Sequence, residues 1–334
     1  MRVLVTGCAG FIGAHLCMKL LKKNIEVIGI DNLNAYYDAS LKEARLNLFK
    51  SDPRFRFYKV DIANKTALSH VFEDNDITHV VNLAAQPGVR YSLQHPDVYL
   101  QSNIVGFFNV LELSRHYGIL HVVFSSSSSV YGANTAQPYS EHDHTDHPIA
   151  LYAATKKANE VMAHSYAASH GLPCTGLRFF TVYGPWGRPD MALFTFTRQM
   201  LAKESIEVYN NGEMARDFTY VDDVVESVAR IVDKPAMPDD AWHSDAPDAA
   251  SSYAPYRLYN VGRGEPVTLM DFIHALEKAL GIQAIKKFLP LQQGDVVKTA
   301  ADISLLSQAI SFKPSVTLQE GVEKFVMWYR SYYG

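Results

Sequence analysis

The stretch that decides the fold is residues 1–13, which read MRVLVTGCAGFIG. The run VLV at residues 3–5 is wholly apolar and too short for a helix, so it predicts a strand buried on both faces of a parallel sheet. Three glycines follow with the spacing G-x-x-G-x-x-G, namely Gly7, Gly10 and Gly13. In such a turn the first glycine allows the tight bend, the second lets backbone approach a diphosphate, and the third lets the next helix pack closely.

A helix is expected over residues 14–23, where leucines recur at helical spacing. The strand, the glycine turn and this helix together predict a diphosphate at the positive end of the helix. A second apolar strand at residues 26–30 leads into Asp31, close to the distance at which a carboxylate accepts hydrogen bonds from the 2′-hydroxyl of an adenosine ribose. Because a carboxylate there would repel a 2′-phosphate, the sequence favours NAD over NADP.

The overall composition bounds the class of protein. The 334 residues are 48% hydrophobic and 20% charged, which is ordinary for a globular protein with a large core. The net charge is −4 and no lysine- or arginine-rich stripe is present, so a nucleic-acid partner is not expected. Cys8, Cys17 and Cys174 have neither metal-ligand spacing nor a disulfide pattern, which predicts no metal site and a reducing compartment. The first strand begins at residue 2 and no apolar run reaches membrane length, so we expect a cytoplasmic protein without a membrane anchor.

Strand and helix patterns alternate through the first two thirds of the chain. Further strands are expected at residues 55–60, 79–83, 121–124 and 175–179, and helices at residues 66–72, 98–117 and 151–170. This alternation is typical of a Rossmann-type α/β fold, a doubly wound parallel sheet whose ligands bind beyond the carboxyl ends of its strands. Residues 1–180 are therefore expected to form the NAD-binding domain.

The composition changes after residue 180, where glycine, proline and aromatic residues separate short periodic segments. Helices are expected there at residues 193–202, 222–232, 268–280 and 318–332. We expect residues 181–334 to form mainly a smaller, discontinuous lobe that binds the substrate, with segments near 215–235 and 257–264 returning to the first domain. Residues 235–255, rich in alanine, aspartate, serine and proline, are expected to form a flexible insertion, either a solvated flap or a disordered segment.

The residues that carry chemistry begin with Tyr152 and Lys156, which are four apart and therefore share one helix face. A tyrosine hydroxyl ordinarily ionises at about pH 10, but an ammonium group one turn away would favour the phenolate and lower the pKa of Tyr152. The pair would then accept a proton from an alcohol. Such pairs also arise by chance on surface helices, but here the pair follows a nucleotide-binding pattern, which favours the functional interpretation.

Three strand ends carry residues that would suit a nucleotide or a sugar. The hydroxyls of residues 125–129, all serine, stand where the fifth strand is expected to leave the sheet and could relay a sugar proton to Tyr152; the alternative is a low-complexity loop. Asp61 with the apolar Ile62 could cradle an adenine, or Asp61 could be a helix N-cap. The small residues at 84–85 would let backbone lie against the cofactor.

Together these features resemble the extended short-chain dehydrogenase/reductase superfamily, and within it the nucleotide-sugar epimerases. The motifs that carry the resemblance span nearly the whole chain: TGxxGFIG at 6–13, DN at 31–32, DI at 61–62, LAA at 83–85, NxxG at 103–106, SSS at 125–127, YxxxK at 152–156 and RDFTYVDD at 216–223. Three longer stretches are most similar to the epimerases that act on UDP-glucuronate at C4: DNLNAYYD at 31–38, RFFTVYGPWGRPDMA at 178–192 and SSYAPYRLYNVG at 251–262.

The resemblance implies that NAD is bound tightly and recycled, that Tyr152 is the base with Lys156 as its partner, and that Ser127 relays the proton. Carried over position by position, the residues expected to bind NAD are Gly7, Gly10, Phe11, Ile12, Gly13, Asp31, Asn32, Asp61, Ile62, Leu83, Ala84, Ala85, Asn103, Tyr152 and Lys156. Those expected to bind a UDP-sugar are Ser127, Ser128, Thr181, Arg188, Tyr209, Arg216 and Asp295. Among these, Tyr209 is expected against uracil, Arg216 as a diphosphate clamp and Asp295 on the ribose.

The chain also departs from related enzymes in ways that bear on the substrate. UDP-galactose 4-epimerases carry arginine where Gln292 stands and asparagine where Thr181 stands; the second departure lies near the expected C6 and fits a carboxylate better than a hydroxymethyl group. Related dehydratases and decarboxylases place acidic residues where Ser128 and Ser129 stand. Without a carboxyl group there to direct elimination, the resemblance implies epimerisation.

The implied reaction is NAD-dependent 4-epimerisation of UDP-glucuronate to UDP-galacturonate through a 4-keto intermediate, with hydride returned to the opposite face of C4. That intermediate is a β-keto acid, so its carboxylate must be held away from the alignment that releases CO2. Thr181, Ser127 and Ser128 are candidate donors, and Arg188 either adds charge or is a surface arginine on a loop. The alternatives are a neutral UDP-hexose 4-epimerase or a UDP-glucuronate decarboxylase on the same scaffold, and, with less support, a non-catalytic NAD-sensing protein.

The two long helices predicted at residues 98–117 and 151–170 also bear on assembly. Related enzymes pair two such helices from each subunit into a four-helix bundle, so the resemblance implies a homodimer. Phe107, Phe108 and Leu111 are expected on a helix face that the sheet does not use.

Overall fold

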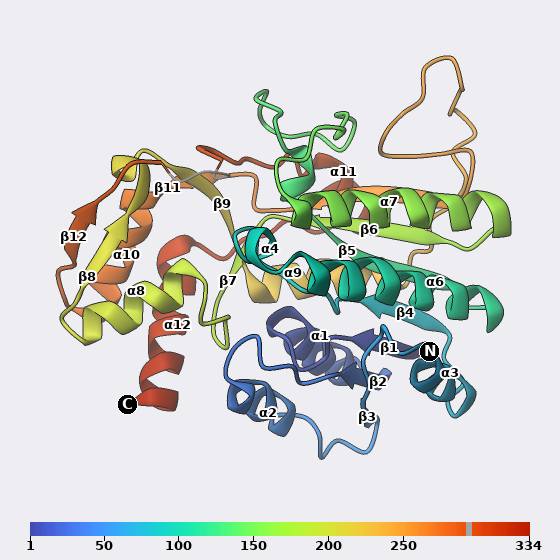
Figure 1. Ribbon diagram of the computed structural model, residues 1–334, viewed down its shortest axis with the longest axis horizontal. Coiled ribbons are helices and arrows are strands. Elements are labelled where there is room, and N and C mark those ends of the chain that lie inside the picture. The colour runs from blue at the N-terminus through green and yellow to red at the C-terminus, as the bar shows by residue number, and fades with distance from the viewer. Residues whose placement is uncertain (292–295) are drawn as a thin grey trace.

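The computed structural model describes residues 1–291 and 296–334, and it is organised around a seven-stranded sheet in which neighbouring strands are parallel (Figure 1). The strand order is β10-β6-β5-β4-β1-β2-β3. The strands are β1 (Arg2–Thr6), β2 (Glu26–Asp31), β3 (Phe55–Lys59), β4 (His79–Asn82), β5 (His121–Ser127), β6 (Cys174–Phe179) and β10 (Tyr256–Val261). The predicted doubly wound parallel sheet is confirmed.

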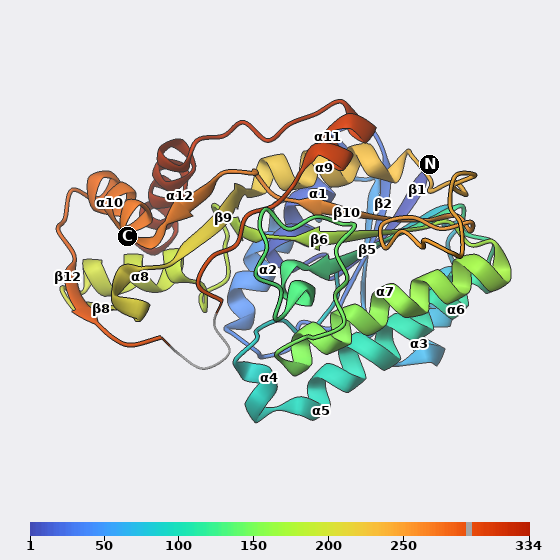
Figure 2. The same cartoon turned by 90° about the horizontal axis from the view of Figure 1, so that it is seen from above.

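Alternate side chains of each strand point to opposite faces, and this divides the core into two layers. On one face Val3 and Val5 pack with the apolar residues of α1 (Phe11–Lys22) and α9 (Val221–Val232). On the other face Leu4 packs with α3 (Lys65–Glu73), α6 (Gly106–His116) and α7 (Leu151–His170). Figures 1 and 2 show α6 and α7 side by side along that second face.

The point where the strand order reverses fixes the place of the site. After β3 the chain returns to the middle of the sheet, so β1 lies between β2 and β4. Ligands of open α/β sheets bind in the crevice at such a reversal, outside the carboxyl ends of the strands. The glycine turn between β1 and α1 opens into that crevice, and α2 (Ala39–Asn47) follows the loop that leaves β2.

Two local predictions differ from the structure. The helix expected over residues 98–117 is three successive segments, α5 (Pro96–Tyr99), the π-helical turn η1 (Leu100–Val105) and α6, preceded by α4 (Tyr91–Gln94). A π-helical turn of this kind is frequent beside functional sites, and here it contains Asn103. The serines expected to follow the fifth strand instead belong partly to it, since β5 runs to Ser127 and the 3₁₀ turn η2 (Ser128–Tyr131) comes next.

The expectation that Phe107, Phe108 and Leu111 share an outward face is wrong for two of them. Phe107 and Leu111 are one helical turn apart and face the sheet, with 1% and 0% of their surface exposed. Only Phe108, which is 41% exposed, points away from the core.

A second lobe stands beside the carboxyl edge of the sheet (Figure 1). It holds a three-stranded sheet of order β11-β9-β7 and a two-stranded sheet of β12 and β8. Its strands are β7 (Thr181–Tyr183), β8 (Ser205–Val208), β9 (Ala215–Tyr220), β11 (Pro266–Thr268) and β12 (Ile285–Phe288). Its helices are α8 (Ala192–Leu201), η3 (Tyr209–Gly212), α10 (Leu269–Leu280) and α12 (Leu318–Tyr333), and α11 (Ser304–Ile310) lies near α9 and β10. These helices match the predicted ones to within a residue where one was predicted, whereas the short strands of the lobe were not predicted.

Residues 235–255 contain neither a named helix nor a named strand. The segment folds back on itself, since the amide of Asp239 donates to the carbonyl of Ser252 at 2.8 Å. The hydroxyl of Ser252 also lies 2.8 Å from Nε2 of His164 on α7. Within the described residues, no helix is both long enough and apolar enough to cross a membrane.

Candidate active site

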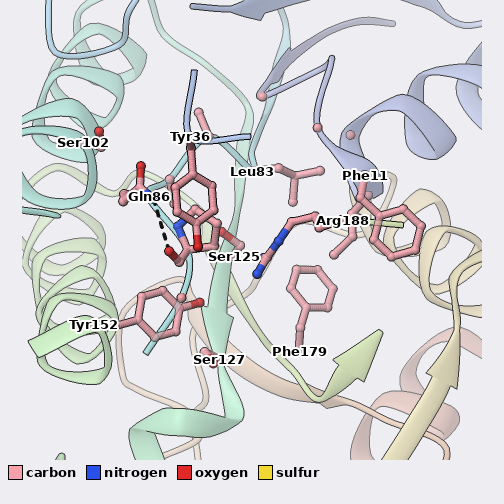
Figure 3. A pocket seen from close by; sticks show the side chains of 18 of the residues that line it. Phe11, Tyr36, Leu83, Gln86, Ser102, Ser125, Ser127, Tyr152, Phe179 and Arg188 are labelled. Carbon is pink, nitrogen blue, oxygen red and sulfur yellow. Dashed lines mark hydrogen bonds between the residues drawn. The ribbon is translucent and has the colours of Figure 1, made fainter. Parts of the chain in front are cut away.

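A cavity of about 410 Å³ lies beyond the carboxyl ends of β1, β4 and β5, and Figure 3 shows it from close by. This volume is within the range of small-molecule sites. Of the residues expected to bind NAD, those that line it are Gly7, Gly10, Phe11, Ile12, Gly13, Asp31, Asn32, Asp61, Ile62, Leu83, Ala84, Ala85, Tyr152 and Lys156. Of those expected to bind a UDP-sugar, Ser127, Ser128, Thr181 and Arg188 line it as well.

The glycine turn has the geometry that the sequence predicted. Gly7 has a φ of +69°, and a Cβ on Gly13 would lie 2.1 Å from the carbonyl oxygen of Gly7. A side chain at Gly13 would therefore force the helix away from the turn. Gly10 is the N-cap of α1 and gives it no side-chain cap, so the positive end of the helix faces the cavity through its first residues. This arrangement fits a diphosphate.

Asp31 is held in place by backbone amides at the end of β2. One of its carboxylate oxygens accepts from the amide of Ala9 at 3.1 Å and the other from the amide of Leu33 at 2.8 Å. Asn32 donates to the carboxylate of Asp61 at 2.8 Å, which joins two of the motifs that were expected at the adenosine. The donor and acceptor set at this end of the cavity therefore fits an adenosine ribose.

Asn103 lies behind the cavity and does not line it. Its side-chain oxygen accepts from the amide of Gln86 at 2.8 Å, and its nitrogen donates to Thr155 Oγ1 on α7 at 3.0 Å. Gln86, which lines the cavity, is therefore positioned by the π-helical turn. Asn103 acts here on the loop after β4, and its side chain holds that loop against α7.

Lys156 is buried, and its ammonium group is directed at the end of β5. Its Nζ donates to the carbonyl oxygen of Ser125 at 2.8 Å and to the hydroxyl of the same residue at 3.0 Å. Burial lowers the pKa of Lys156 to about 7. Burial raises the pKa of Tyr152, against a hydrogen bond with Ser127 and the charge of Arg188, which lower it. The predicted lowering of the tyrosine pKa by Lys156 is not found in this structure, because the ammonium group is directed at Ser125.

The serine strand end is fixed from behind by a buried ion pair. The hydroxyl of Ser126 donates to Glu160 on α7 at 2.6 Å. The same carboxylate receives two hydrogen bonds from Arg178, at 2.9 and 3.0 Å, and both side chains of the pair are almost fully buried. Since Arg178 neutralises it, Glu160 is a support for the strand, and the neighbouring Ser127 hydroxyl is left beside Tyr152 (Figure 3).

Arg188 is part of the cavity wall and does not lie on an outer loop. Figure 3 shows its guanidinium in the middle of the pocket, near Phe179. Two of its nitrogens donate to the carboxylate of Asp190, at 3.0 and 2.7 Å, and the hydroxyl of Tyr36 donates to the same carboxylate at 3.2 Å. Asp190 and Tyr36 thus orient the arginine. Among the described residues that line the cavity, the acidic ones are Asp31 and Asp61, both at the adenosine end.

Two further predicted substrate ligands, Tyr209 and Arg216, are not among the described residues that line the cavity. The ring of Tyr209 lies 5.3 Å from the guanidinium of Arg90. Arg216 donates to the carbonyl oxygens of Ala215 and Val297, each at 3.0 Å. Asp295 and Gln292 lie outside the described residues. The described parts of the chain hold no group of three or more histidine, cysteine or acidic side chains that could bind a metal ion.

This geometry can be set beside known proteins. The profile of the NAD dependent epimerase/dehydratase family matches residues 3–243. The chain belongs to this family. The resemblance to the extended short-chain dehydrogenase/reductases is thereby confirmed, and NAD is the cofactor that the family uses.

Relatives within the family match the chain along its whole length. Protein CapI of Staphylococcus aureus is 56% identical over 333 residues, which cover 100% of this chain and 99% of the relative. A probable UDP-glucuronate 4-epimerase of Rhizobium meliloti is 46% identical over 334 residues, covering 100% and 98%. The crystal structure of a UDP-glucuronic acid 4-epimerase from Bacillus cereus, in complex with UDP-glucuronic acid and NAD, is similar with a TM-score of 0.89, at 34% identity and full coverage of both chains.

Several residues of this family member's cavity were not predicted. They include Tyr36, Lys42 and Gln86, all of which line it. Tyr36 lies inside the DNLNAYYD stretch and Gln86 directly follows the LAA motif. Their neighbours in sequence pointed to the cavity, but no residue-type rule distinguishes a cavity tyrosine or glutamine from one in an ordinary loop.

Proposed function

We propose that the protein catalyses the NAD-dependent 4-epimerisation of UDP-glucuronate to UDP-galacturonate. The observation that carries this proposal is that Ser127, Tyr152, Thr181 and Arg188 line the same cavity as the glycine turn. The family match and the similarity to a structure that contains UDP-glucuronic acid and NAD support it.

The residues at the end of β5 provide the acid–base chemistry. Tyr152 takes the proton of the sugar 4-hydroxyl, either directly or through Ser127, which lies beside it. Lys156 holds the carbonyl of Ser125 and so fixes the strand end on which Ser127 stands. The glycine turn would hold NAD, which would supply the hydride acceptor for C4 and then the hydride donor to the opposite face of the resulting ketone. The protonated Tyr152 then restores the hydroxyl.

Thr181 and Arg188, in the cavity wall, bind the carboxylate of the sugar. A 4-keto uronic acid loses CO2 when its carboxylate bond aligns with the ketone π-system. The Thr181 hydroxyl and the Arg188 guanidinium would hold the carboxylate out of that alignment through charge-assisted hydrogen bonds. Arg188 is already oriented by Asp190, and a bidentate clamp of this kind is costly to move.

The same wall argues against the alternatives on this scaffold. A decarboxylase or dehydratase needs an acidic group near C5 or C6. The acidic residues in the described cavity lining stand at the adenosine end. A neutral-sugar epimerase does not need an arginine directed into the part of the cavity that holds the sugar, because its substrate has no carboxylate there. A non-catalytic NAD sensor has no use for the three residues Ser127, Tyr152 and Lys156 together.

The nucleotide half of the substrate is assigned to the second lobe. Tyr209 lies against the uracil, Arg216 binds the diphosphate and Asp295 binds the uridine ribose. Tyr209 stands on η3 and Arg216 on β9. Arg216 donates to the carbonyl oxygen of Val297, which is two residues after Asp295 in the sequence.

One assay tests the proposed function. Purified protein is incubated separately with UDP-glucuronate and UDP-glucose, without added NAD, and the sugar products are resolved. We expect UDP-galacturonate from the first and little turnover of the second, with NAD released when the protein is denatured. Faster turnover of UDP-glucose would refute the carboxylate assignment, and a stoichiometric demand for added NAD would indicate a dehydrogenase.

We further propose that the protein is a homodimer through a four-helix bundle of α6 and α7. These helices lie side by side on one face, and Val105, Phe108 and Val161 are exposed apolar residues of that region, at 38%, 41% and 58%. Light scattering at micromolar concentration is expected to give the mass of two chains, and Val161→Glu to give that of one. A wild-type monomer would refute the proposal.

A further inference from the structure

Arg45 on α2 is a fully buried arginine whose partners are all neutral. It is 0% exposed. Its guanidinium donates to the carbonyl oxygens of Trp186, Gly187 and Ala9 and to the hydroxyl of Tyr37. In the described part of the chain no carboxylate pairs with it. A buried charge that is satisfied by neutral carbonyl and hydroxyl groups alone is unusual, since buried charges are normally paired.

The carbonyl acceptors of Arg45 belong to two separate segments of the chain. Ala9 lies inside the glycine turn, between Gly7 and Gly10, and its carbonyl is 3.1 Å from Nη1. The carbonyl of Trp186 accepts from both Nε and Nη2, at 3.0 and 2.7 Å. One side chain therefore connects the turn that receives a diphosphate to the loop that precedes Arg188.

The loop before Arg188 has a backbone that needs such support. Trp186 has a φ of +62°, in the left-handed region that a bulky residue rarely occupies. Residues in this region persist where their surroundings determine them. On one side the indole of Trp186 packs against Trp328 and Tyr332 of α12, with ring centroids 5.1 and 5.0 Å away. On the other side its carbonyl is held by Arg45.

We propose that Arg45 is a positioning residue that couples the glycine turn to the loop carrying Arg188, so that retention of NAD and placement of the Arg188 guanidinium both depend on it. The coupling has a plain electrostatic basis. An anionic diphosphate bound at the glycine turn would attract the guanidinium of Arg45, which fixes the carbonyls of Ala9 and Trp186. The consequence for sugar selectivity rests on the proposed function, whereas the consequence for NAD and for the loop does not.

The test compares Arg45→Lys with Arg54→Lys. The second is a matched control, because Arg54 is a partly exposed arginine that pairs with Asp52 at 2.6 Å, away from the glycine turn. Three quantities are measured on NAD-loaded protein: the rate of NAD dissociation, hydrogen exchange of the peptide 184–191, and kcat and KM for UDP-glucuronate and UDP-glucose. A lysine keeps the charge but cannot bind the carbonyls of both segments with a forked group.

For Arg45→Lys we expect NAD to dissociate at least tenfold faster and the 184–191 peptide to exchange at least tenfold faster, while α12 keeps its protection. KM for UDP-glucuronate should rise several-fold more than KM for UDP-glucose. Arg54→Lys should leave all three unchanged. If only NAD dissociation or only loop exchange changes, or if exchange rises uniformly over the chain, Arg45 does not couple the two segments and the proposal is overturned.

A second arm needs no substitution and decides the matter if Arg45→Lys does not fold. ADP carries the adenosine and diphosphate of NAD but no nicotinamide. Added to wild-type protein from which NAD has been removed, it is expected to slow hydrogen exchange in 184–191. Unchanged exchange under saturating ADP would overturn the coupling. A wild-type preference for UDP-glucose would instead refute the proposed function. The tests by NAD dissociation and by hydrogen exchange of 184–191 would remain valid.

Discussion

The two ends of the cavity are built in different ways. At the cofactor end one contiguous stretch, residues 7–13, contributes backbone: glycines, an open helix terminus and an amide that holds Asp31. The sugar end is formed by side chains from separate elements, among them Tyr152 on α7, Ser127 on β5 and Arg188 on a loop. A site made of backbone depends on the absence of side chains at a few glycine positions. A site made of side chains depends on each functional group and on the residues that orient it.

The largest effect is expected at the sugar end. Tyr152→Phe should lower kcat by roughly 10²–10⁴-fold, the usual worth of a general acid–base group. NAD content and UDP-sugar affinity should fall much less than kcat, because the hydroxyl is one contact among many in binding but takes part directly in the chemical step. Steady-state kinetics, isothermal titration with UDP-glucuronate and NAD release measure the three. Near-normal turnover would exclude Tyr152 from the mechanism.

At the cofactor end, the corresponding disruptive substitution is Gly13→Ala. The new Cβ would lie 2.1 Å from the carbonyl oxygen of Gly7, so helix and turn must separate. We expect about 1–3 kcal/mol lower stability, as for overpacked cores, and loss of most co-purifying NAD. Gly118→Ala is the control, since nothing lies within 4 Å of its Cβ although its φ is +63°. Thermal unfolding and NAD release should separate the two variants; equal NAD content would contradict the assigned role of Gly13.

An effect smaller than that of Tyr152→Phe is expected at the part of the cavity wall that is proposed to hold the sugar carboxylate. A hydrogen bond to a charged group is worth about 1.5–3 kcal/mol, so Thr181→Ala should change the balance between carboxylate rotamers by roughly 10–100-fold. Epimerisation of UDP-glucuronate should slow, and a decarboxylated UDP-pentose should appear among the products. Product analysis by chromatography checks this. If the variant gives slower epimerisation with no pentose, Thr181 does not control the rotamer.

The smallest effect concerns the pH dependence of stability. Burial lowers the pKa of Lys156 to about 7 from its ordinary 10.5, so between these values the unfolded chain binds more protons than the folded one. Stability from this group therefore rises with pH across that window. Between pH 7.5 and 8.5, the free energy of unfolding of the NAD-free wild type should increase, relative to that of Lys156→Met, by up to about 1 kcal/mol per pH unit. Chemical denaturation at the two pH values measures the difference; a constant difference would contradict a pKa of Lys156 that is lowered by burial.

The contrast between the two ends also explains what could be predicted from the sequence. The glycine turn and Asp31 are read from local spacing, and the structure brings them together as expected. Tyr152 and Lys156 are likewise local, being one turn apart on a helix. The direction of the Lys156 ammonium was not predictable, because it depends on Ser125, which another element supplies.

Elsewhere the missing information is tertiary. Helical spacing alone does not say which face of a helix meets the sheet, so Phe107 and Leu111 were placed outward although they are buried. The strands of the second lobe have three to six residues, too few for a period to show. Arg188 could be assigned to a wall only once Asp190 and Tyr36 were seen to orient it.

The place of β10 in the sheet has a consequence for the order in which the chain folds. β10 pairs with β6, yet 76 residues separate the end of one strand from the start of the other, Phe179 from Tyr256. During synthesis the open edge of β6 must therefore wait until residues 180–255 have been made. An unpaired strand edge of this kind is a site for wrong pairing with other chains. The nascent protein is thus most prone to aggregate while residues 180–255 are emerging, after its cofactor turn is complete and before its sheet is.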